Sequence, residues 1–376
     1  MARVRMIALV VFCSLAPAAW GTPFSNIYFF GDSLSDSGNI SALSGGGYPA
    51  APYYNGRFSN GPTWAETFAY LKGFPGAGQH AGMTLGPNYL NLSVAGTGNN
   101  YAIGGARTGT NGAVDSLGIP TGMQVQAYYY LSKAHTADPN SLYVLFGGAN
   151  DVRDAAKLAP PQMDQTAGNA AYNLASSVRL LSSAGAKNFL VLNLPNIGNT
   201  PEARLELNNS TAATAATQYF NAALSLYLGA LSVPGENLTT FDTYSLFQSI
   251  YQDALNGGQF TGITNATTPC FAGFAGSTGS DCNKAIFSDD LHPTALLHAL
   301  LGSIVNNLVQ GVPAANLPTL AAGLESASIE GIAQHFTNPD LIHVSAAVPE
   351  PGGALLAGGG LLFALLLRRR STRNRS

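Results

Sequence analysis

A serine and a histidine, far apart in the chain, are the residue types that nucleophilic catalysis requires. Ser33 follows the short apolar segment Ile27–Phe30, and His292 lies three residues after Asp289. A serine hydroxyl becomes nucleophilic when an imidazole accepts its proton, and the imidazole needs a carboxylate that fixes its tautomer and stabilises its charge. One tight turn would place Asp289 and His292 on the same side. Taken alone, Ser33 is equally typical of a turn or a helix cap after a strand.

Two glycine-containing segments carry groups that can stabilise a developing negative charge. The first, Phe146–Asp151, contains Asn150, whose side-chain amide can donate a hydrogen bond to an oxyanion. The second, Asn100–Ala106, contains two adjacent glycines whose backbone amides can approach a ligand closely. Each segment by itself is also typical of a tight turn with a capping asparagine.

Together these segments resemble the four sequence blocks of the GDSL, or SGNH, hydrolase family. They read, in the family's order, GDSLSDSGN (31–39), NYAIGGA (100–106), GGAND (147–151) and DDLHP (289–293). The resemblance covers about residues 26–308 and implies that Ser33 is the nucleophile, His292 the general base and Asp289 its orienting partner. Asp290 is the alternative to Asp289, although the family spacing Asp-x-x-His favours Asp289.

The same resemblance implies an oxyanion hole made by the backbone N–H of Ser33, the N–H of Gly105 and the Asn150 side chain. Gly104 remains the alternative to Gly105, because the two glycines are adjacent. The segment Gly56–Trp64 resembles the subgroup that contains bacterial phospholipase/haemolysin-type enzymes and plant GDSL esterases. No metal and no organic cofactor is expected.

The implied activity is that of an exported serine ester hydrolase, of the carboxylesterase or lipase type, which passes through an acyl-enzyme. Carbohydrate O-acetyl esterase is the alternative, so the expected substrate is an ester of a lipid or an acylated carbohydrate. A different class, a non-catalytic surface or matrix protein on the same scaffold, is disfavoured by the complete set of catalytic residue types. The sequence does not determine the acyl-chain length, the alcohol or the oligomeric state.

Alternating short apolar and longer helical segments predict the fold class, a three-layer α/β/α sandwich. The resemblance makes it the flavodoxin-like SGNH-hydrolase sandwich, with a mainly parallel sheet of five strands. The predicted strands, continuously apolar as in sheets buried on both faces, are Asn26–Phe30, Asn99–Ile103, Leu142–Phe146, Asn188–Leu194 and Leu238–Phe241. The predicted helices are Thr63–Leu71, Met123–Ala134, Gln162–Ala184, Ala212–Leu231 and Thr294–Leu308. The expected hydrolase domain is residues 22–311, followed by a spacer over 312–347.

Charge is distributed unevenly along the 376 residues. Seven of the 17 basic residues lie at the two ends, so residues 22–347 hold 10 basic against 19 acidic residues, a formal charge of −9. A body this acidic, with no basic stripe, argues against nucleic-acid binding. With 46% hydrophobic and 10% charged residues, the chain is able to bury a sizeable core, which argues against disorder.

The first 21 residues have the order of a secretory signal peptide. Arg3 and Arg5 precede the apolar run Met6–Leu15, and small residues follow up to Gly21. The run is shorter than the roughly 20 residues that a membrane span needs. Cleavage is expected after Gly21 or Ala18, with export of the rest of the chain.

The last residues, 348–376, resemble the PEP-CTERM sorting signal of Gram-negative bacteria. Val348-Pro349-Glu350-Pro351 precedes sixteen uncharged residues, 352–367, and then three arginines. These residues predict a short transmembrane helix with its basic end in the cytoplasm. The resemblance implies an exosortase-type processing enzyme as a partner, transient anchoring and a final location at the cell surface or outside. A tail that is retained as a plain anchor is the alternative.

Two cysteines remain after the signal peptide, Cys270 and Cys282, within a Gly/Ser/Thr-rich stretch. In an oxidising compartment they are expected to form a small disulfide-closed loop. Two free thiols are the alternative. No Cys/His spacing indicates a zinc site.

Overall fold

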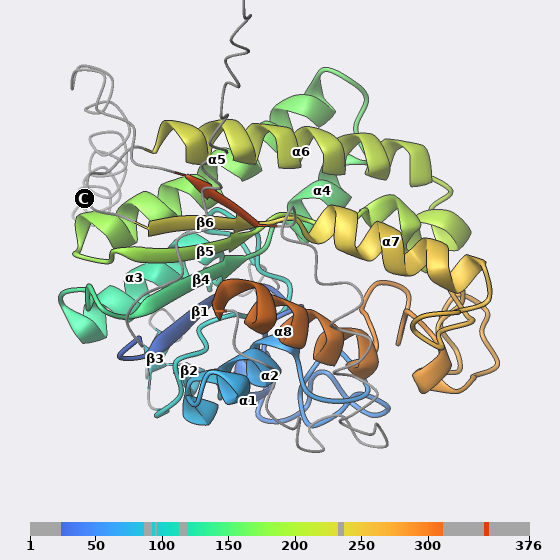
Figure 1. Ribbon diagram of the computed structural model, residues 1–376, viewed down its shortest axis with the longest axis horizontal. Coiled ribbons are helices and arrows are strands. Elements are labelled where there is room, and N and C mark those ends of the chain that lie inside the picture. The colour runs from blue at the N-terminus through green and yellow to red at the C-terminus, as the bar shows by residue number, and fades with distance from the viewer. Residues whose placement is uncertain are drawn as a thin grey trace, which may run out of the picture.

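A five-stranded sheet of order β1-β4-β5-β6-β7 forms the centre of the computed structural model (Figure 1). The structure describes residues 24–85, 92–94, 96–112, 119–231, 237–310 and 342–345. The first four strands of that order run parallel, and β7 pairs antiparallel with β6. Their bounds are Ile27–Gly31 for β1, Leu142–Phe146 for β4, Asn188–Leu192 for β5, Asn237–Phe241 for β6 and Ile342–Ser345 for β7. Two short strands, β2 (Met83–Leu85) and β3 (Leu92–Val94), form a separate antiparallel pair.

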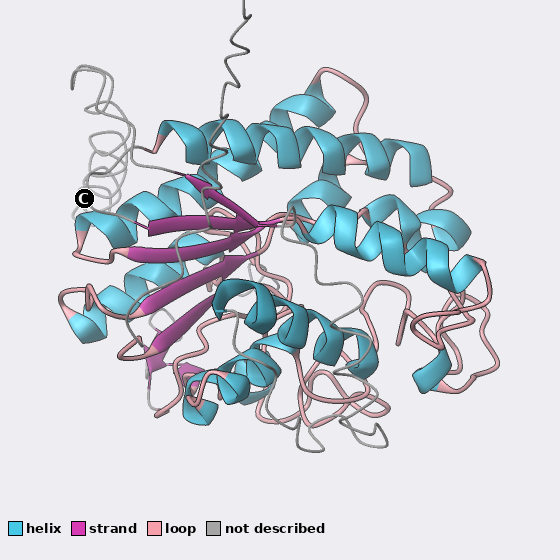
Figure 2. Ribbon diagram, viewed as in Figure 1, coloured by secondary structure: helices cyan, strands magenta, loops and turns pink. Residues whose placement is uncertain are grey.

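Helices flank the sheet on both faces (Figure 2). Helices α2 and α8 pack together on one face, whereas α3, α5 and α6 pack in sequence on the other. The bounds are α1 Asn39–Leu43, α2 Trp64–Leu71, α3 Met123–Ala134, α4 Ala149–Ala155, α5 Gln162–Ser183, α6 Ser210–Ala230, α7 Thr243–Leu255 and α8 Ala295–Gln310. The layered α/β architecture predicted from the sequence is confirmed.

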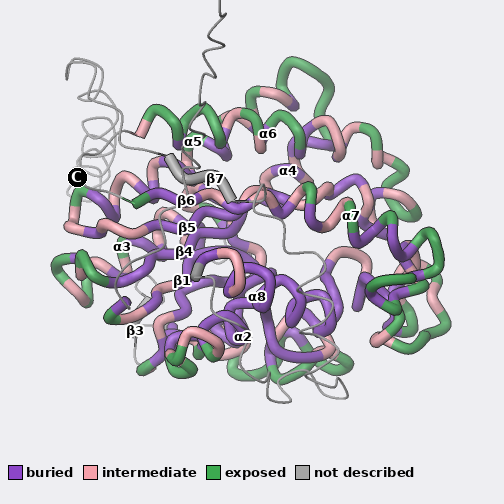
Figure 3. The backbone as a smooth tube through the Cα atoms, viewed as in Figure 1, coloured by how far each residue is buried: buried purple, intermediate pink, exposed green. Residues whose placement is uncertain are grey.

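Alternation of side chains along β1 divides the core between the two helical layers. Phe29 contacts the rings of Trp64 and Phe68 on α2, whereas Phe30 contacts Tyr130 on α3. Successive residues of a strand point to opposite faces, so one strand supplies large rings to both layers. Figure 3 shows the resulting buried centre, with exposed residues mainly on the outer helical faces and in loops.

One predicted strand is wrong. Residues 99–103 run beside β1 and exchange hydrogen bonds with it, from Phe29 N–H to the Asn99 carbonyl and from Tyr101 N–H to the Phe29 carbonyl. Only an isolated parallel bridge, between Phe29 and Asn100, results. The reason is local, because the Asn100 side-chain oxygen accepts the Ala102 N–H and turns the backbone there. The fifth strand of the sheet is instead β7, inside the predicted spacer, where no strand was expected.

The predicted helices are confirmed with ends that differ by no more than two residues, and α1, α4 and α7 are additional. The predicted signal peptide (1–21), most of the spacer and the sorting segment (348–376) lie outside the described residues. Within the part of the chain that the structure describes, no helix has the length and hydropathy to cross a membrane.

Candidate active site

The carboxyl end of β1 and the loop before α8 bring Ser33, His292 and Asp289 into one hydrogen-bonded chain. Ser33 Oγ lies 2.8 Å from His292 Nε2, and His292 Nδ1 lies 2.7 Å from Asp289 Oδ2. The three side chains come from positions up to 259 residues apart, and their exposed fractions are 7%, 8% and 3% for Ser33, His292 and Asp289. All three side chains are therefore largely shielded from water.

The surroundings of Asp289 fix the protonation pattern. Its Oδ1 accepts the backbone N–H of Leu291 and of His292, at 2.8 and 2.6 Å. Burial by itself would raise the pKa of Asp289, but the charge and hydrogen bonds of His292, with a further bond from Tyr53, lower the pKa below its usual value. An ionised carboxylate only accepts hydrogen bonds, so His292 carries its hydrogen on Nδ1. In the neutral imidazole, Nε2 is then free to accept the Ser33 proton.

The Asp289 loop is held by its own backbone and by Asn60. Ser288 N–H donates to the His292 carbonyl, which closes the turn that places Asp289 beside His292. The Asn60 side-chain oxygen accepts the N–H of Ala295, the first residue of α8, and also lies 3.3 Å from Ser288 Oγ. The turn is thereby fixed on both sides of His292.

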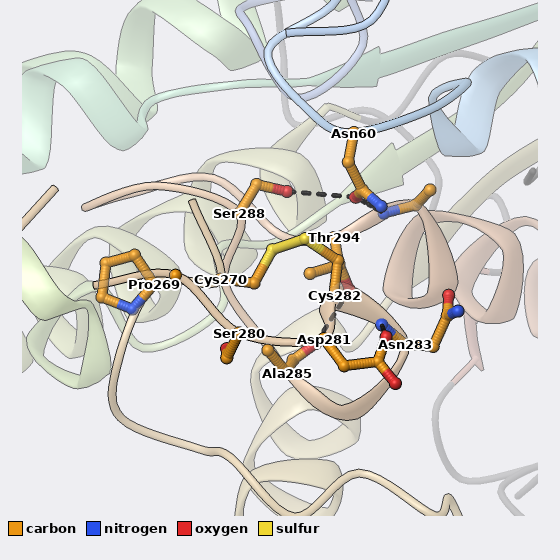
Figure 4. Close-up of a disulfide and its surroundings, with 12 residues drawn as sticks. Asn60, Pro269, Cys270, Ser280, Asp281, Cys282, Asn283, Ala285, Ser288 and Thr294 are labelled. Carbon is orange, nitrogen blue, oxygen red and sulfur yellow. Dashed lines mark hydrogen bonds between the residues drawn. A yellow bond between two sulfur atoms is a disulfide. The ribbon is translucent and has the colours of Figure 1, made fainter. Parts of the chain in front are cut away.

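A disulfide between Cys270 and Cys282 lies next to this turn (Figure 4). Cys270 N–H donates to the Phe287 carbonyl and Phe271 N–H donates to the Ser288 carbonyl, so the closed loop pairs with the residues that lead into Asp289. The disulfide therefore also restricts the backbone segment that leads into Asp289.

The two adjacent glycines of the second block differ in the use of their backbone N–H groups. Gly104 N–H donates to Asp36 Oδ2 at 2.7 Å, inside the first block. Gly105 N–H makes no hydrogen bond to any described residue, and neither does Ser33 N–H. Both Ser33 and Gly105 line the same cavity. Two backbone donors without a partner among the described residues therefore belong to residues that line this cavity, and of the two glycines it is Gly105 whose N–H is available.

Asn150 lies in the first turn of α4, directly after β4. Gly148, which precedes the helix, has φ 116°, and a side chain there would collide with the ring of Phe220. Asn150 Nδ2 donates to the Ala106 carbonyl at 3.0 Å, and its Oδ1 accepts from Arg153 Nη1 at 3.0 Å. Because arginine only donates, this contact fixes which end of the amide is the nitrogen. The second hydrogen of Nδ2 remains available for a ligand.

Asp290, the alternative to Asp289, does not contact His292. Its carboxyl faces Glu206, and burial together with the charges of Glu206, Asp289 and Glu202 raises the pKa of Asp290 to about 6. The structure thus brings Ser33, His292, Asp289, Gly105 and Asn150 together and leaves Asp290 outside the triad.

Three residues whose contacts the sequence did not predict support these groups. Tyr53 Oη donates to Asp289 Oδ2 at 2.5 Å, from a loop that follows α1. Arg153, one turn after Asn150, forms a two-pronged ion pair with Glu202, with Nε–Oε2 at 2.6 Å and Nη2–Oε1 at 2.5 Å. The spacing of Asn150 and Arg153 on one helix face is a readable signal, whereas nothing in the sequence links Tyr53 to Asp289.

Among the described residues, no group of three or more His, Cys, Asp or Glu side chains is placed to hold a metal ion.

Comparison with known proteins gives a consistent picture. The model of the GDSL-like lipase/acylhydrolase family matches residues 27–305. The chain is 28% identical over 295 residues to the thermolabile hemolysin of Vibrio parahaemolyticus, across 73% of this chain and 61% of that protein. It is 30% identical over 347 residues to esterase EstA of Pseudomonas aeruginosa, across 82% of this chain and 51% of that protein. The chain therefore spans less than two thirds of the length of either relative.

Among solved structures, the native aryl esterase of M. smegmatis matches with a TM-score of 0.39 and 17% identity, over 76% of this chain and 97% of that one. The residues matched by the family model contain all four blocks that supply the serine, the histidine, the carboxylate and the surrounding donors. The chain belongs to the GDSL-like lipase/acylhydrolase family.

Proposed function

We propose that this protein hydrolyses carboxylic esters, with Ser33 as nucleophile, His292 as general base and acid, and Asp289 as the residue that orients and stabilises His292. The observation that carries the proposal is the continuous chain from Ser33 Oγ to His292 Nε2 and from His292 Nδ1 to Asp289, at 2.8 and 2.7 Å. A buried serine with an imidazole base and an ionised carboxylate behind it has the geometry of an activated nucleophile.

The first half of the reaction forms an acyl-enzyme. Ser33 Oγ attacks the carbonyl carbon of the ester while His292 Nε2 accepts the hydroxyl proton. The oxyanion receives hydrogen bonds from Ser33 N–H, Gly105 N–H and the second Nδ2 hydrogen of Asn150, none of which has to leave another partner. His292 then gives its proton to the alcohol oxygen as the carbon–oxygen bond breaks, and the alcohol leaves.

The second half restores the enzyme. His292 accepts a proton from a water molecule, whose oxygen adds to the acyl carbon, and the same three donors hold the second oxyanion. The bond between the acyl carbon and Ser33 Oγ breaks, and Ser33 takes back the proton from His292. Asp289 stays ionised throughout and stabilises the imidazolium that forms in each half.

The direct test is hydrolysis of p-nitrophenyl acetate and butanoate by the full-length chain and by Ser33→Ala. The variant should keep the same thermal unfolding temperature but lose turnover on the order of 10⁴-fold or more. Turnover in Ser33→Ala within tenfold of that in the unmodified chain would refute the assignment. Retained turnover would favour another catalytic group, whereas absence of turnover in both proteins would favour the non-catalytic surface protein.

We also propose that the chain is exported and that its C-terminal segment is a sorting signal removed by an exosortase-type enzyme. Support comes from the order of charged, apolar and small residues at 1–21, from the Pro-Glu-Pro, apolar and basic order at 348–376, and from a disulfide suited to an oxidising compartment. Removal of both ends leaves an acidic protein that should focus below the isoelectric point of about 6.0 calculated for the whole sequence. Recovery of a protein with an isoelectric point near 6 and the full-length mass would contradict this processing.

A further inference from the structure

Ser33 lies between two cavities that differ in volume and in the polarity of their walls. One has a volume of about 50 Å³ and the other about 300 Å³, and Ser33, Asn150 and His292 line both. The walls of the small cavity are mainly apolar and include Trp64, Phe146, Phe247, Tyr251, Phe287 and Leu301. The walls of the large cavity are polar and apolar in about equal parts, and their polar residues include Tyr48, Tyr53, Arg153, Glu202, Glu206 and Asp290. An ester consists of an acyl group and an alcohol, and this arrangement offers each of them a cavity of different polarity.

The small cavity limits the acyl chain. A site for one water molecule needs roughly 10–15 Å³, so a volume of about 50 Å³ accepts about four non-hydrogen atoms beyond the carbonyl group. Its inner walls belong to the core, since Trp64 on α2 and Leu301 on α8 are almost completely buried. Close-packed core side chains resist displacement, so a long alkyl chain would have to force apart two helices that pack against each other.

The large cavity is suited to a polyhydroxylated alcohol. With about 300 Å³ it is large enough for a sugar ring, and its carboxylates and tyrosine hydroxyls can exchange hydrogen bonds with several hydroxyl groups. It contains the carboxylates of Asp289, Asp290, Glu202 and Glu206 against the single guanidinium of Arg153, which is already paired with Glu202. An alcohol that carries a phosphate or carboxylate would be repelled there, because the positive charge of Arg153 is already neutralised by Glu202.

We propose that the enzyme removes short acyl groups, acetyl to about pentanoyl, from neutral polyhydroxylated alcohols such as a sugar unit. The acyl chain enters the apolar cavity and the alcohol occupies the acidic one. This inference rests on the proposed ester hydrolase function and favours the carbohydrate ester over the long-chain lipid. The alcohol leaves with the proton that His292 received from Ser33, and water supplies the hydroxyl of the released acid.

The acyl side is tested with the full-length chain and p-nitrophenyl acetate, butanoate, octanoate and palmitate. We expect the highest kcat/KM with acetate or butanoate and a value at least 100-fold lower with palmitate. Phe247→Ala, which enlarges the small cavity from the α7 side, should move the optimum toward octanoate. Leu246→Ala is the matched control, because Leu246 is the neighbouring buried residue of α7 and does not line the cavity. An optimum at palmitate, or an equal shift in both variants, would overturn the acyl assignment.

The alcohol side is tested at pH 8, where the carboxylates are ionised, with acetylated methyl glucoside and with diacetyl phosphatidylglycerol, which carry the same acyl group. We expect kcat/KM to be at least tenfold higher for the neutral glucoside at low ionic strength. Glu206→Gln should reduce this ratio about threefold or more, whereas Asp164→Asn, with the same charge change outside the cavity, should leave it unchanged. A preference for the anionic ester, or equal effects of the two substitutions, would overturn the assignment of the alcohol.

Failure of this inference and failure of the proposed function would give different experimental results. Ser33-dependent hydrolysis with the wrong chain length or the wrong alcohol would remove this inference and leave the ester hydrolase in place. Absence of any Ser33-dependent hydrolysis across both sets of esters would remove the proposed function itself.

Discussion

The hydroxyl of Tyr53 offers a way to separate the stability of the triad from its chemistry. Tyr53 Oη donates to Asp289 Oδ2 at 2.5 Å, and the same oxygen accepts the Nδ1 hydrogen of His292 at 2.7 Å. The Tyr53 ring contacts Phe271 and Phe274 of the disulfide-closed segment, with centroids 5.4 and 6.0 Å apart. In Tyr53→Phe these ring contacts remain, and only the hydrogen bond to the carboxylate is lost.

The size of the effect follows from the charge of the acceptor. A hydrogen bond to a charged group contributes about 1.5–3 kcal/mol, so the free energy of unfolding of Tyr53→Phe should fall by that amount. Asp289 is ionised both before and during the reaction, so most of this bond is present in the ground state as well as in the transition state. Only a difference between these states affects turnover, and kcat should therefore fall by only about 3-fold to 10-fold.

Urea unfolding and p-nitrophenyl butanoate kinetics measure the two effects on the same protein. Tyr48→Phe is the matched control, because Tyr48 lines the same cavity and makes no hydrogen bond to Asp289. The pKa of Asp289 in the folded protein lies below its usual value. The stabilisation from such a carboxyl is fully present above the usual pKa and is lost as the pH falls from there through the lowered pKa. The loss in Tyr53→Phe should therefore be the same at pH 7 and pH 5. A loss below 0.5 kcal/mol, or one equal to that of Tyr48→Phe, would refute the reasoning.

Three further predictions concern the oxyanion donors, the disulfide and the buried carboxyls. Asn150→Ala should lower kcat on the order of 100-fold to 1000-fold, measured on the same esters at a temperature where the variant is folded, because one oxyanion donor is lost; wild-type turnover would remove Asn150 from the hole. Replacement of both Cys270 and Cys282 by serine opens a loop with a sequence separation of 12. The free energy of unfolding should fall by about 3 kcal/mol in urea titrations. A change below 1 kcal/mol would mean that other contacts hold the loop. Burial raises the pKa of Asp36 and of Asp151 to about 6, so the folded state binds protons that the unfolded state releases between about pH 4 and 6. The pKa of Asp32 and of Asp290 is also raised to about 6, whereas the lowered pKa of buried His298 acts in the opposite direction. The four carboxyls together should make stability rise as the pH falls from 7.5 to 5, and calorimetry that shows a lower unfolding temperature at pH 5 would contradict this sign.

Local patterns in the sequence were sufficient to predict most of the fold. Strands β1, β4 and β5 are almost entirely apolar, and β6 was predicted although it contains Asn237, Thr239 and Thr240. The predicted ends of the long helices lie within two residues of the observed ones. Helix α7 was missed although Leu246, Ile250 and Ala254 repeat at helical spacing and are buried. The error at residues 99–103 has a different origin, since a single side chain, Asn100, takes a backbone hydrogen bond that a strand would have used.

The reacting groups of the candidate site could also be predicted, because each lies in a short block with its own spacing. The residues that support these groups could not be predicted. Tyr53 and Asp289 are 236 residues apart and meet only through the fold. The choice between Gly104 and Gly105 depends on the direction of one N–H group, which the contact of Gly104 with Asp36 decides. The polarity of the two cavities is likewise a property of side chains from five or more separate segments.

The central claim is that His292 activates Ser33, and labelling with a serine-directed fluorophosphonate tests it most directly. In the full-length chain the probe should attach to Ser33 alone, as located by peptide mass spectrometry. Labelling should vanish in Ser33→Ala and slow by at least 100-fold in His292→Ala, since the hydroxyl then lacks its base. Persistent labelling of Ser33→Ala, or an unchanged labelling rate in His292→Ala, would contradict the account.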